Sequence, residues 1–216
     1  SRWVCPTGHS FDVARQGYLG LLTGARSVGG DDGPMIEARQ ALLASGAYAP
    51  LRDAVARAAA GALTASAATT AGGAGVILDS GTGTGYYLAG ALEAAPAAIG
   101  IGMDVSAAAV RAAARAHPRA AAVRWDVGRD WPIADGSVDA VLTVFAPRNL
   151  AQARRVLRRD GSLLLARPTQ RHLRGLREAL AGAGIDLVGV EAAKEDRLAE
   201  SIAPHFATQQ THLIEH

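Results

Sequence analysis

The residues best suited to chemistry surround a run of three glycines. Residues 76–85 read VILDSGTGTG, so a short apolar run ends at Asp79 and is followed by Gly81, Gly83 and Gly85. The apolar run predicts a buried strand, and a helix is expected to begin at Tyr86. Glycines at such a turn let a ligand lie against the backbone, and parallel sheets bind ligands beyond the carboxyl ends of their strands. The segment therefore predicts a ligand site at a strand-to-helix turn.

The spacing of these glycines indicates which ligand fits. A dinucleotide fingerprint reads G-x-G-x-x-G and places a pyrophosphate on the helix N-terminus. This chain has G-x-G-x-G preceded by Asp79, whose carboxylate would oppose a pyrophosphate but suits the α-amino group of an amino acid. S-adenosylmethionine carries an ammonium, a sulfonium and no phosphate, so it is expected in place of NAD. A glycine-rich turn without a ligand is the other interpretation.

Two more acids follow the next predicted strands. Asp104 comes 19 residues after Gly85, where a carboxylate can accept both ribose hydroxyls. Asp126 follows the third strand and could accept a hydrogen bond from an adenine amino group. The alternatives are a helix N-terminal acid for Asp104 and an ordinary loop acid for Asp126. Together with the glycines, the acids favour a nucleoside site.

The elements that position these residues alternate along the chain. Apolar runs predict strands at 76–78, 99–103, 121–125, 138–145, 162–166 and 206–214, and helical patterns occupy 86–95, 106–117, 150–158 and 173–183. Asp160-Gly161 is expected to form a turn. Alternation with continuous apolar strands predicts the α/β class, a doubly wound, mostly parallel sheet.

Composition excludes several classes of protein. The 216 residues are 49% hydrophobic and 19% charged, with one cysteine and a net charge of +2, which excludes a disordered chain and a disulfide framework. The sequence shows no targeting segment or membrane span, so a cytoplasmic protein is expected. Between 148 and 177 nine arginines face one acid. This asymmetry indicates an anionic partner or else a solvated helix surface.

The motif of Asp79 and the three glycines, with Asp104, resembles the class I S-adenosylmethionine-dependent methyltransferases over residues 75–167. This resemblance implies a Rossmann-like fold and S-adenosylmethionine as cofactor, but it does not identify the substrate.

A narrower resemblance covers nearly the whole chain. Residues 5–18, 35–39, 46–51, 85–87 and 171–173 resemble the 23S ribosomal RNA guanine-N1 methyltransferases, and 145–149 and 197–206 are most similar to their tylosin-resistance branch. The resemblance implies methylation of a guanine N1 in the hairpin-35 loop of 23S rRNA, macrolide resistance and a homodimer. It also implies a zinc-ribbon-like RNA-recognition module at 1–34 and a methyltransferase domain at 35–216, with a helical lead-in at 35–74.

The same resemblance assigns further residues to the cofactor. Tyr48, Tyr87, the adjacent Leu88 and His172 fall at positions where this family contacts S-adenosylmethionine. Tyr48 is expected to close over the ligand as a lid. Tyr87 and Leu88 open the helix beside the glycine loop, and His172 follows the fifth predicted strand.

No residue identifies itself as a catalytic base for guanine N1. The loop 145–149 (FAPRN) follows the fourth predicted strand, where a target base would enter. Phe145 could stack on the base, and Arg148 or Asn149 could bond its exocyclic oxygen. A rigid turn is the alternative interpretation.

The amino-terminal metal site is incomplete in this sequence. Cys5 and His9 match half of the family's zinc site, and two ligands cannot complete a tetrahedral structural site. The expectation is that further ligands precede Ser1 or that no zinc binds, and that a final strand follows His216. Two other functions remain open: a small-molecule methyltransferase and an RNA-binding homologue without catalysis. An NAD-dependent oxidoreductase is excluded by the glycine spacing.

Overall fold

The computed structural model describes residues 2–4, 7–22, 29–67, 73–185, 194–207 and 210–215. The chain divides into two compact units, one of residues 1–165 with 212–216 and one of residues 166–211. None of the described helices is long and apolar enough to cross a membrane.

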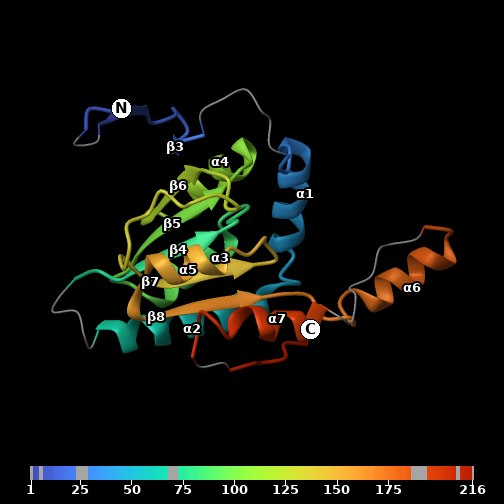
Figure 1. Ribbon diagram of the computed structural model, residues 1–216. Helices are drawn as coiled ribbons and strands as arrows, with labels where there is room; N and C mark the ends of the chain where they lie inside the picture. Colours follow the sequence, from blue (N-terminus) through green and yellow to red (C-terminus); the bar gives the residue numbers. More distant parts are fainter. Residues whose placement is uncertain are drawn as a thin grey trace. The chain divides into compact units, whose positions relative to one another are not determined.

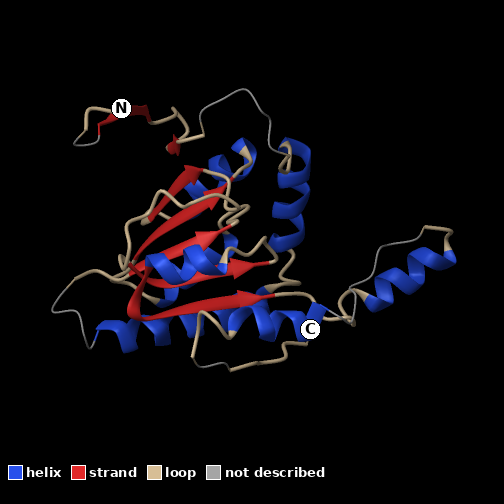
Figure 2. Ribbon diagram, in the orientation of Figure 1, coloured by secondary structure: helices blue, strands red, loops and turns tan. Residues whose placement is uncertain are grey.

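The first unit is built on a six-stranded sheet (Figures 1 and 2). Its strands, in spatial order, are β3 (Tyr18–Gly20), β6 (Ala120–Arg124), β5 (Ile99–Asp104), β4 (Val76–Ser80), β7 (Val138–Val144) and β8 (Leu157–Ala166). The pairs β3–β6, β6–β5, β5–β4 and β4–β7 are all parallel. The sequence-based prediction of an α/β, mostly parallel sheet is confirmed.

The centre of the sheet is apolar because it is covered on both faces. Every residue of β7 is buried, and Ile77 and Leu78 of β4 are completely buried. After β4 the chain moves to β5 on one side and later returns to β7 on the other. A reversal of this kind opens a crevice at the carboxyl ends of the two central strands.

The helices that flank the sheet are α1 (Gly33–Ala44), α2 (Ala49–Ala67), α3 (Tyr86–Ala94), α4 (Ala107–Ala116) and α5 (Leu150–Val156). Asp32 caps α1 by accepting a hydrogen bond from the Met35 backbone N–H, and Ser106 caps α4 in the same way. Ile36 of α1 packs in one buried cluster with Ala109 and Ala112 of α4. Helix α2 packs along α3, and Figure 1 shows α5 on the other face of the sheet.

The described amino-terminal residues contribute strands to two sheets. Strands β1 (Arg2–Val4) and β2 (Ser10–Asp12) make an antiparallel hairpin. Tyr18, however, begins β3, which joins the main sheet beside β6. The described contacts group the hairpin and β3 with the main sheet in one unit. The domain boundary at residue 34 stays a prediction.

The second unit contains helices α6 (Arg174–Gly182) and α7 (Lys194–Ile202). The predicted strand at 206–214 is wrong for the described residues of that range, which have no strand structure. The favourable strand pattern there is short and lies in a segment rich in polar residues, so it has little apolar surface to bury.

The predicted turn at Asp160-Gly161 is also wrong, because β8 runs unbroken from Leu157 to Ala166. A Cβ on Gly161 would lie 3.0 Å from the carbonyl oxygen of Asp139. The glycine therefore permits a close approach between the backbones of neighbouring strands, and pairing overrides the local turn preference.

Candidate functional site

The glycine loop lies directly after β4 and is fastened to the neighbouring strand. The backbone N–H groups of Gly81 and Thr82 donate to the Met103 carbonyl oxygen of β5, at 2.8 and 2.9 Å. Gly81, Gly83 and Gly85 all have positive φ, at 78°, 53° and 79°. Only glycine adopts this conformation without strain, so the chain can turn sharply between strand and helix.

The three glycines serve different purposes. A Cβ on Gly81 would lie 2.4 Å from the Ala146 side chain, and one on Gly85 would lie 2.9 Å from the Cα of Ala113. Those two glycines allow packing within the protein. A Cβ on Gly83 would meet only the Cδ of Arg39, at 4.0 Å. Gly83 is therefore the place where a ligand can approach the backbone.

Asp79 is a buried acid that has a single side-chain partner among the described residues. Its side chain is 2% exposed, and its Oδ2 accepts a 2.8 Å hydrogen bond from the Thr82 hydroxyl. Burial raises the pKa of Asp79 to about 7; the Thr82 hydrogen bond works against this rise and the nearby Asp104 adds to it. Such a carboxylate is stabilised in its charged form when a cation binds beside it.

Asp104 holds the other side of the loop. Its Oδ2 accepts a hydrogen bond from the Gly83 N–H and its Oδ1 accepts one from the Ser106 N–H, both at 2.9 Å. The side chain is partly exposed, and each carboxylate oxygen can accept a second hydrogen bond. The carboxylate therefore keeps the hydrogen-bonding capacity that two ribose hydroxyls would need.

A pocket of about 110 Å³ opens at the carboxyl ends of β4 and β7. Its lining combines the glycine loop with α1, the α1–α2 connection, the start of α3 and the end of β7: Arg39, Leu42, Leu43, Tyr48, Asp79, Gly81, Thr82, Gly83, Thr84, Tyr86, Tyr87, Val144 and Phe145. The crevice predicted by strand order thus coincides with the predicted glycine and aromatic residues.

Aromatic rings form one wall of this pocket. Phe145 meets Tyr48 and Tyr87 edge-on, with ring centroids 6.0 and 6.5 Å apart. Tyr48 lines the pocket, and its role as a lid stays a prediction. Leu88 does not line the pocket: it is fully buried, and its side chain packs against Gly100 of β5.

The Tyr87 hydroxyl is buried and, among the described residues, has no hydrogen-bond partner. Burial raises the pKa of Tyr87 above its ordinary value, and the neighbouring Tyr48, Tyr86 and Asp79 add to the rise. A buried hydroxyl without a partner is costly. Its position in the pocket lining fits a hydroxyl that a ligand satisfies.

S-adenosylmethionine fits this set of residues. Asp79 offers a carboxylate to an ammonium, Gly83 leaves the backbone open, and Asp104 has oxygens for ribose hydroxyls. The unpartnered Tyr87 hydroxyl is available to a polar group of the ligand.

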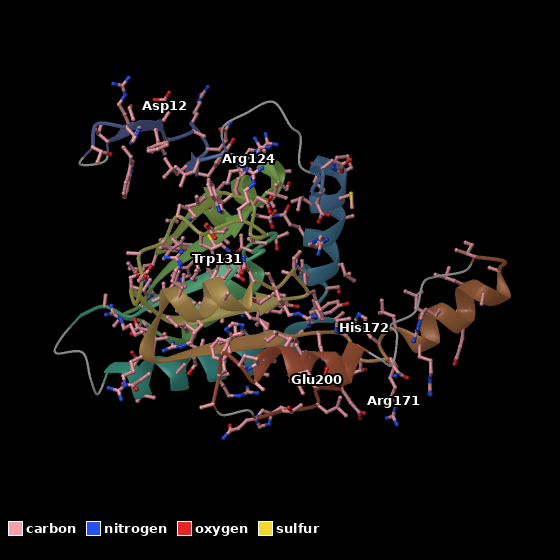
Figure 3. The ribbon with its side chains drawn as sticks, viewed as in Figure 1. Asp12, Arg124, Trp131, Arg171, His172 and Glu200 are labelled. Carbon is pink, nitrogen blue, oxygen red and sulfur yellow. The ribbon has the colours of Figure 1, made fainter. Side chains whose placement is uncertain are left out.

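Of the cofactor residues predicted from the sequence, four in the first unit do not line this pocket: Gly85, Leu88, Asp104 and Asp126. Asp126 accepts a hydrogen bond from the Gly128 N–H at 2.9 Å and pairs with Arg129 at 3.3 Å. His172, labelled in Figure 3, belongs to the second unit, and its backbone N–H donates to the Thr169 carbonyl. His9 lies near Thr7, 3.0 Å from its hydroxyl.

The zinc prediction stays untested. Cys5 lies outside the described residues. Within the described residues no three histidine, cysteine or acidic side chains gather as metal ligands.

The three catalytic candidates lie in the loop after β7, but their surroundings differ. Phe145 lines the pocket, is 40% exposed and has a positive φ of 54°. Arg148 is exposed. Asn149 caps α5, and its side-chain nitrogen donates to the carbonyl oxygens of Val127 and Arg129, at 3.3 and 3.2 Å.

Several arginines of the 148–177 segment serve the fold. Arg155 donates to the carbonyls of Trp131 and Ile133 and pairs with Asp135 (Figure 3 labels Trp131). Arg158 pairs with the buried Asp139 at 3.0 Å. The arginine excess is therefore only partly a free basic surface.

Sequence reasoning missed Arg39 and Thr82 as pocket residues. Arg39 stands in the stretch 35–39 that carries the family resemblance, but it lies 40 residues before Asp79 in the chain. Only the packing of α1 on α4 brings it to the glycine loop.

Comparisons with known proteins agree with this geometry. Residues 77–161 match the family model described as "Methyltransferase domain". A relative from Micromonospora griseorubida, assigned as a 23S rRNA (guanine-N1)-methyltransferase, is 46% identical over 96% of this chain and 72% of its own. The 23S rRNA (guanine(748)-N1)-methyltransferase of Streptomyces fradiae is 46% identical over 94% of this chain and 68% of its own.

A solved S-adenosylmethionine-dependent methyltransferase structure from Methanococcus maripaludis shares the fold. It has a TM-score of 0.50 and 17% identity, covering 85% of this chain and 82% of that one. Identity at the level of the two curated relatives, across most of both chains, shows the family. The chain belongs to the 23S rRNA (guanine-N1)-methyltransferases, a class I family that depends on S-adenosylmethionine.

Proposed function

We propose that this protein transfers the methyl group of S-adenosylmethionine to N1 of a guanine in 23S rRNA. The observation that carries the proposal is 46% identity, over 96% and 94% of the chain, to two relatives assigned that activity. The pocket at the carboxyl ends of β4 and β7 supports it, because Asp79, Gly83 and Asp104 suit the cofactor.

The finer proposal concerns the nucleotide. The Streptomyces fradiae relative acts on guanine 748 according to its name. We infer the same position here, in the hairpin-35 loop, and expect its methylation to lower sensitivity to tylosin-type macrolides. A ribosomal substrate places the reaction in the cytoplasm.

The transfer forms a bond between guanine N1 and the methyl carbon, breaks the bond from that carbon to sulfur and releases the N1 proton. S-adenosylmethionine supplies an activated methyl group on a good leaving group. The protein's share is to orient the base, exclude water and place hydrogen bonds on the guanine. No catalytic base is needed within the pocket if the proton passes to solvent at the open mouth.

The loop after β7 has the right properties to hold the base. Phe145 lies at the pocket with 40% of its surface exposed, so a flipped guanine could stack on it. Exposed Arg148 follows and could donate to the guanine oxygen. Asn149 is proposed to act indirectly, by fixing the loop at 127–129 through its amide.

The exposed mouth favours a polymer over a small metabolite. A small-molecule enzyme would enclose its substrate above the Phe145 loop. The exposed Arg148 and Arg159 are suited to phosphate contacts, whereas Arg155 and Arg158 are engaged within the fold.

The test is methyl transfer from labelled S-adenosylmethionine to unmodified 23S rRNA, mapped by primer extension. The expected result is one stop at the hairpin-35 guanine, and its loss when that guanine is replaced by adenine. Phe145→Ala should lower kcat/KM for RNA by about 10-fold or more while S-adenosylmethionine affinity changes little. Methylation of a small metabolite but not of rRNA would contradict the proposal.

A susceptible host that expresses the protein tests the resistance part. Growth at higher tylosin concentration should accompany the primer-extension stop. Modified rRNA with unchanged tylosin sensitivity would remove the resistance claim and leave the methyl transfer intact.

A further inference from the structure

The pocket contains one residue of each charge among its lining side chains. Asp79 is the carboxylate and Arg39, from α1, is the cation. The ligand's amino acid end is a zwitterion, with an ammonium and a carboxylate on one carbon. A pocket with one group of each sign is electrostatically complementary to it.

Arg39 reaches the part of the glycine loop that is open to a ligand. Its Cδ lies 4.0 Å from the position that a Cβ on Gly83 would occupy. The aliphatic part of the side chain therefore runs beside the exposed backbone of Gly83. Arg39 is also one of the residues that line the pocket.

The guanidinium is held in place but still has donors to offer. Its Nη2 pairs with Asp31 at 2.5 Å, and the Asp31 carbonyl in turn accepts a hydrogen bond from the Ser106 hydroxyl. Ile36 fixes the middle of α1 on α4. A guanidinium has five N–H groups, so one acid does not saturate it. An arginine fixed on one side is well prepared to bind a carboxylate on the other.

We propose that Arg39 binds the α-carboxylate of S-adenosylmethionine, while Asp79 accepts the α-ammonium. Asp31 is then a positioning residue that holds the guanidinium in place. This inference rests on the cofactor and not on the RNA substrate proposed above, so the two can fail separately.

The competing explanation is that the Arg39–Asp31 pair only ties the start of α1 to the fold. An ion pair with side chains 46% and 26% exposed contributes little to stability. The two explanations differ in one respect: only the proposed contact depends on the carboxylate of the ligand.

The experiment removes the carboxylate from the ligand and the guanidinium from the protein. Titration calorimetry, without RNA, compares S-adenosylmethionine, S-adenosylhomocysteine and 5′-methylthioadenosine, which lacks the amino acid end. The variants are Arg39→Gln and Arg39→Lys. The control is Arg111→Gln, which removes an exposed arginine from α4 that does not line the pocket.

For Arg39→Gln we expect affinity to fall about 10- to 100-fold for the two ligands with a carboxylate and less than twofold for 5′-methylthioadenosine. Arg39→Lys should recover part of the loss, since lysine keeps the charge without the planar fork. Arg111→Gln should bind all three ligands normally.

Retained binding of 5′-methylthioadenosine also shows that the variant is folded. An equal loss for all three ligands would overturn the proposal and assign Arg39 to the fold. Unchanged affinity for S-adenosylmethionine would overturn it as well.

Discussion

Two buried acids on neighbouring strands, Asp79 and Asp139, differ in how their charge is satisfied. They are 2% and 3% exposed. Asp139, at the amino end of β7, accepts hydrogen bonds from the Ser66 hydroxyl and the Val76 N–H, at 2.5 and 2.8 Å, and pairs with Arg158. Asp79, at the carboxyl end of β4, has only the Thr82 hydroxyl as a side-chain partner within the part of the chain that the structure describes.

This difference indicates which end of the sheet has polar groups that are still able to bind a ligand. At the amino end of the sheet Asp139 has several partners, and Arg119 donates to the carbonyls of Leu92, Ala95 and Ala98. The carboxyl end holds Asp79 with its raised pKa and the unpartnered Tyr87 hydroxyl. Burial of an acid does not identify a site, but a shortage of partners around it does.

The largest expected effect on stability comes from removing the charge of Asp139 at the amino end of the sheet. Asp139→Asn removes a charge that Arg158 and two other donors share, so unfolding free energy should fall by about 2–4 kcal/mol. Urea denaturation measures it. Asp160→Asn, at an exposed position of β8, is the control and should change stability by less than about 0.5 kcal/mol. If Asp139→Asn and Asp160→Asn change the unfolding free energy equally, the stabilising role assigned to Asp139 is wrong.

Asp79→Asn should have the opposite effect on stability. The folded pKa of Asp79 is about 7, above its ordinary 3.8, so the folded state holds the proton more tightly than the unfolded chain. Its stabilising contribution is present below pH 4 and is lost as pH rises to about 7, with a slope of at most about 1.4 kcal/mol per pH unit. The variant should lack this slope and be more stable than wild type at pH 8.

The same substitution should weaken cofactor binding at pH 8 by about 1–3 kcal/mol, because the ammonium loses its counter-charge. Denaturation curves and calorimetry from pH 4 to 8 test both parts. A variant that matches the wild-type pH profile would show that Asp79 does not titrate in this range.

Within the carboxyl end, Gly83→Ala sharpens the comparison further. The positive φ costs about 1 kcal/mol of stability, while the new methyl group points to the ligand side and should weaken S-adenosylmethionine binding by about 1–2 kcal/mol. Gly81→Ala, whose methyl group would meet Ala146, should lose more stability. Identical losses in both assays would remove the distinction between the two glycines.

The smallest effect is expected for Tyr87→Phe. Removing a buried, unpartnered hydroxyl should leave stability unchanged or raise it by less than about 1 kcal/mol, and should lower cofactor affinity by a similar amount. Thermal unfolding and calorimetry measure the two quantities, with Tyr18→Phe on β3 as control. A clear loss of stability would mean that the hydroxyl has a partner within the fold.

The sequence predicted the sheet and the core of the site because both depend on local patterns. Apolar runs located β4 and β7, and the glycine spacing after Asp79 predicted a loop that lines the pocket at the carboxyl end of β4. Arg39 could not be found in this way, since its role depends on how α1 packs on α4. The use of Arg155 inside the fold was hidden for the same reason: its carbonyl partners lie about 22 residues earlier in the chain.

The wrong turn at Asp160-Gly161 shows the limit of residue preferences. Glycine favours a turn by itself, but here it admits the Asp139 carbonyl at a distance where a Cβ would be tightly crowded. The sequence cannot distinguish these two uses of glycine, because the second depends on Asp139, which lies 22 residues earlier in the chain.

The positive φ of Phe145 has a consequence for the role of its side chain. A bulky residue with φ near 54° stores about 1–3 kcal/mol of conformational energy, and glycine at this position would release it. A sequence selected for stability alone would carry glycine after β7. The aromatic ring occupies this position at an energetic disadvantage, so its expected role is in the pocket that it lines and not in the stability of the chain.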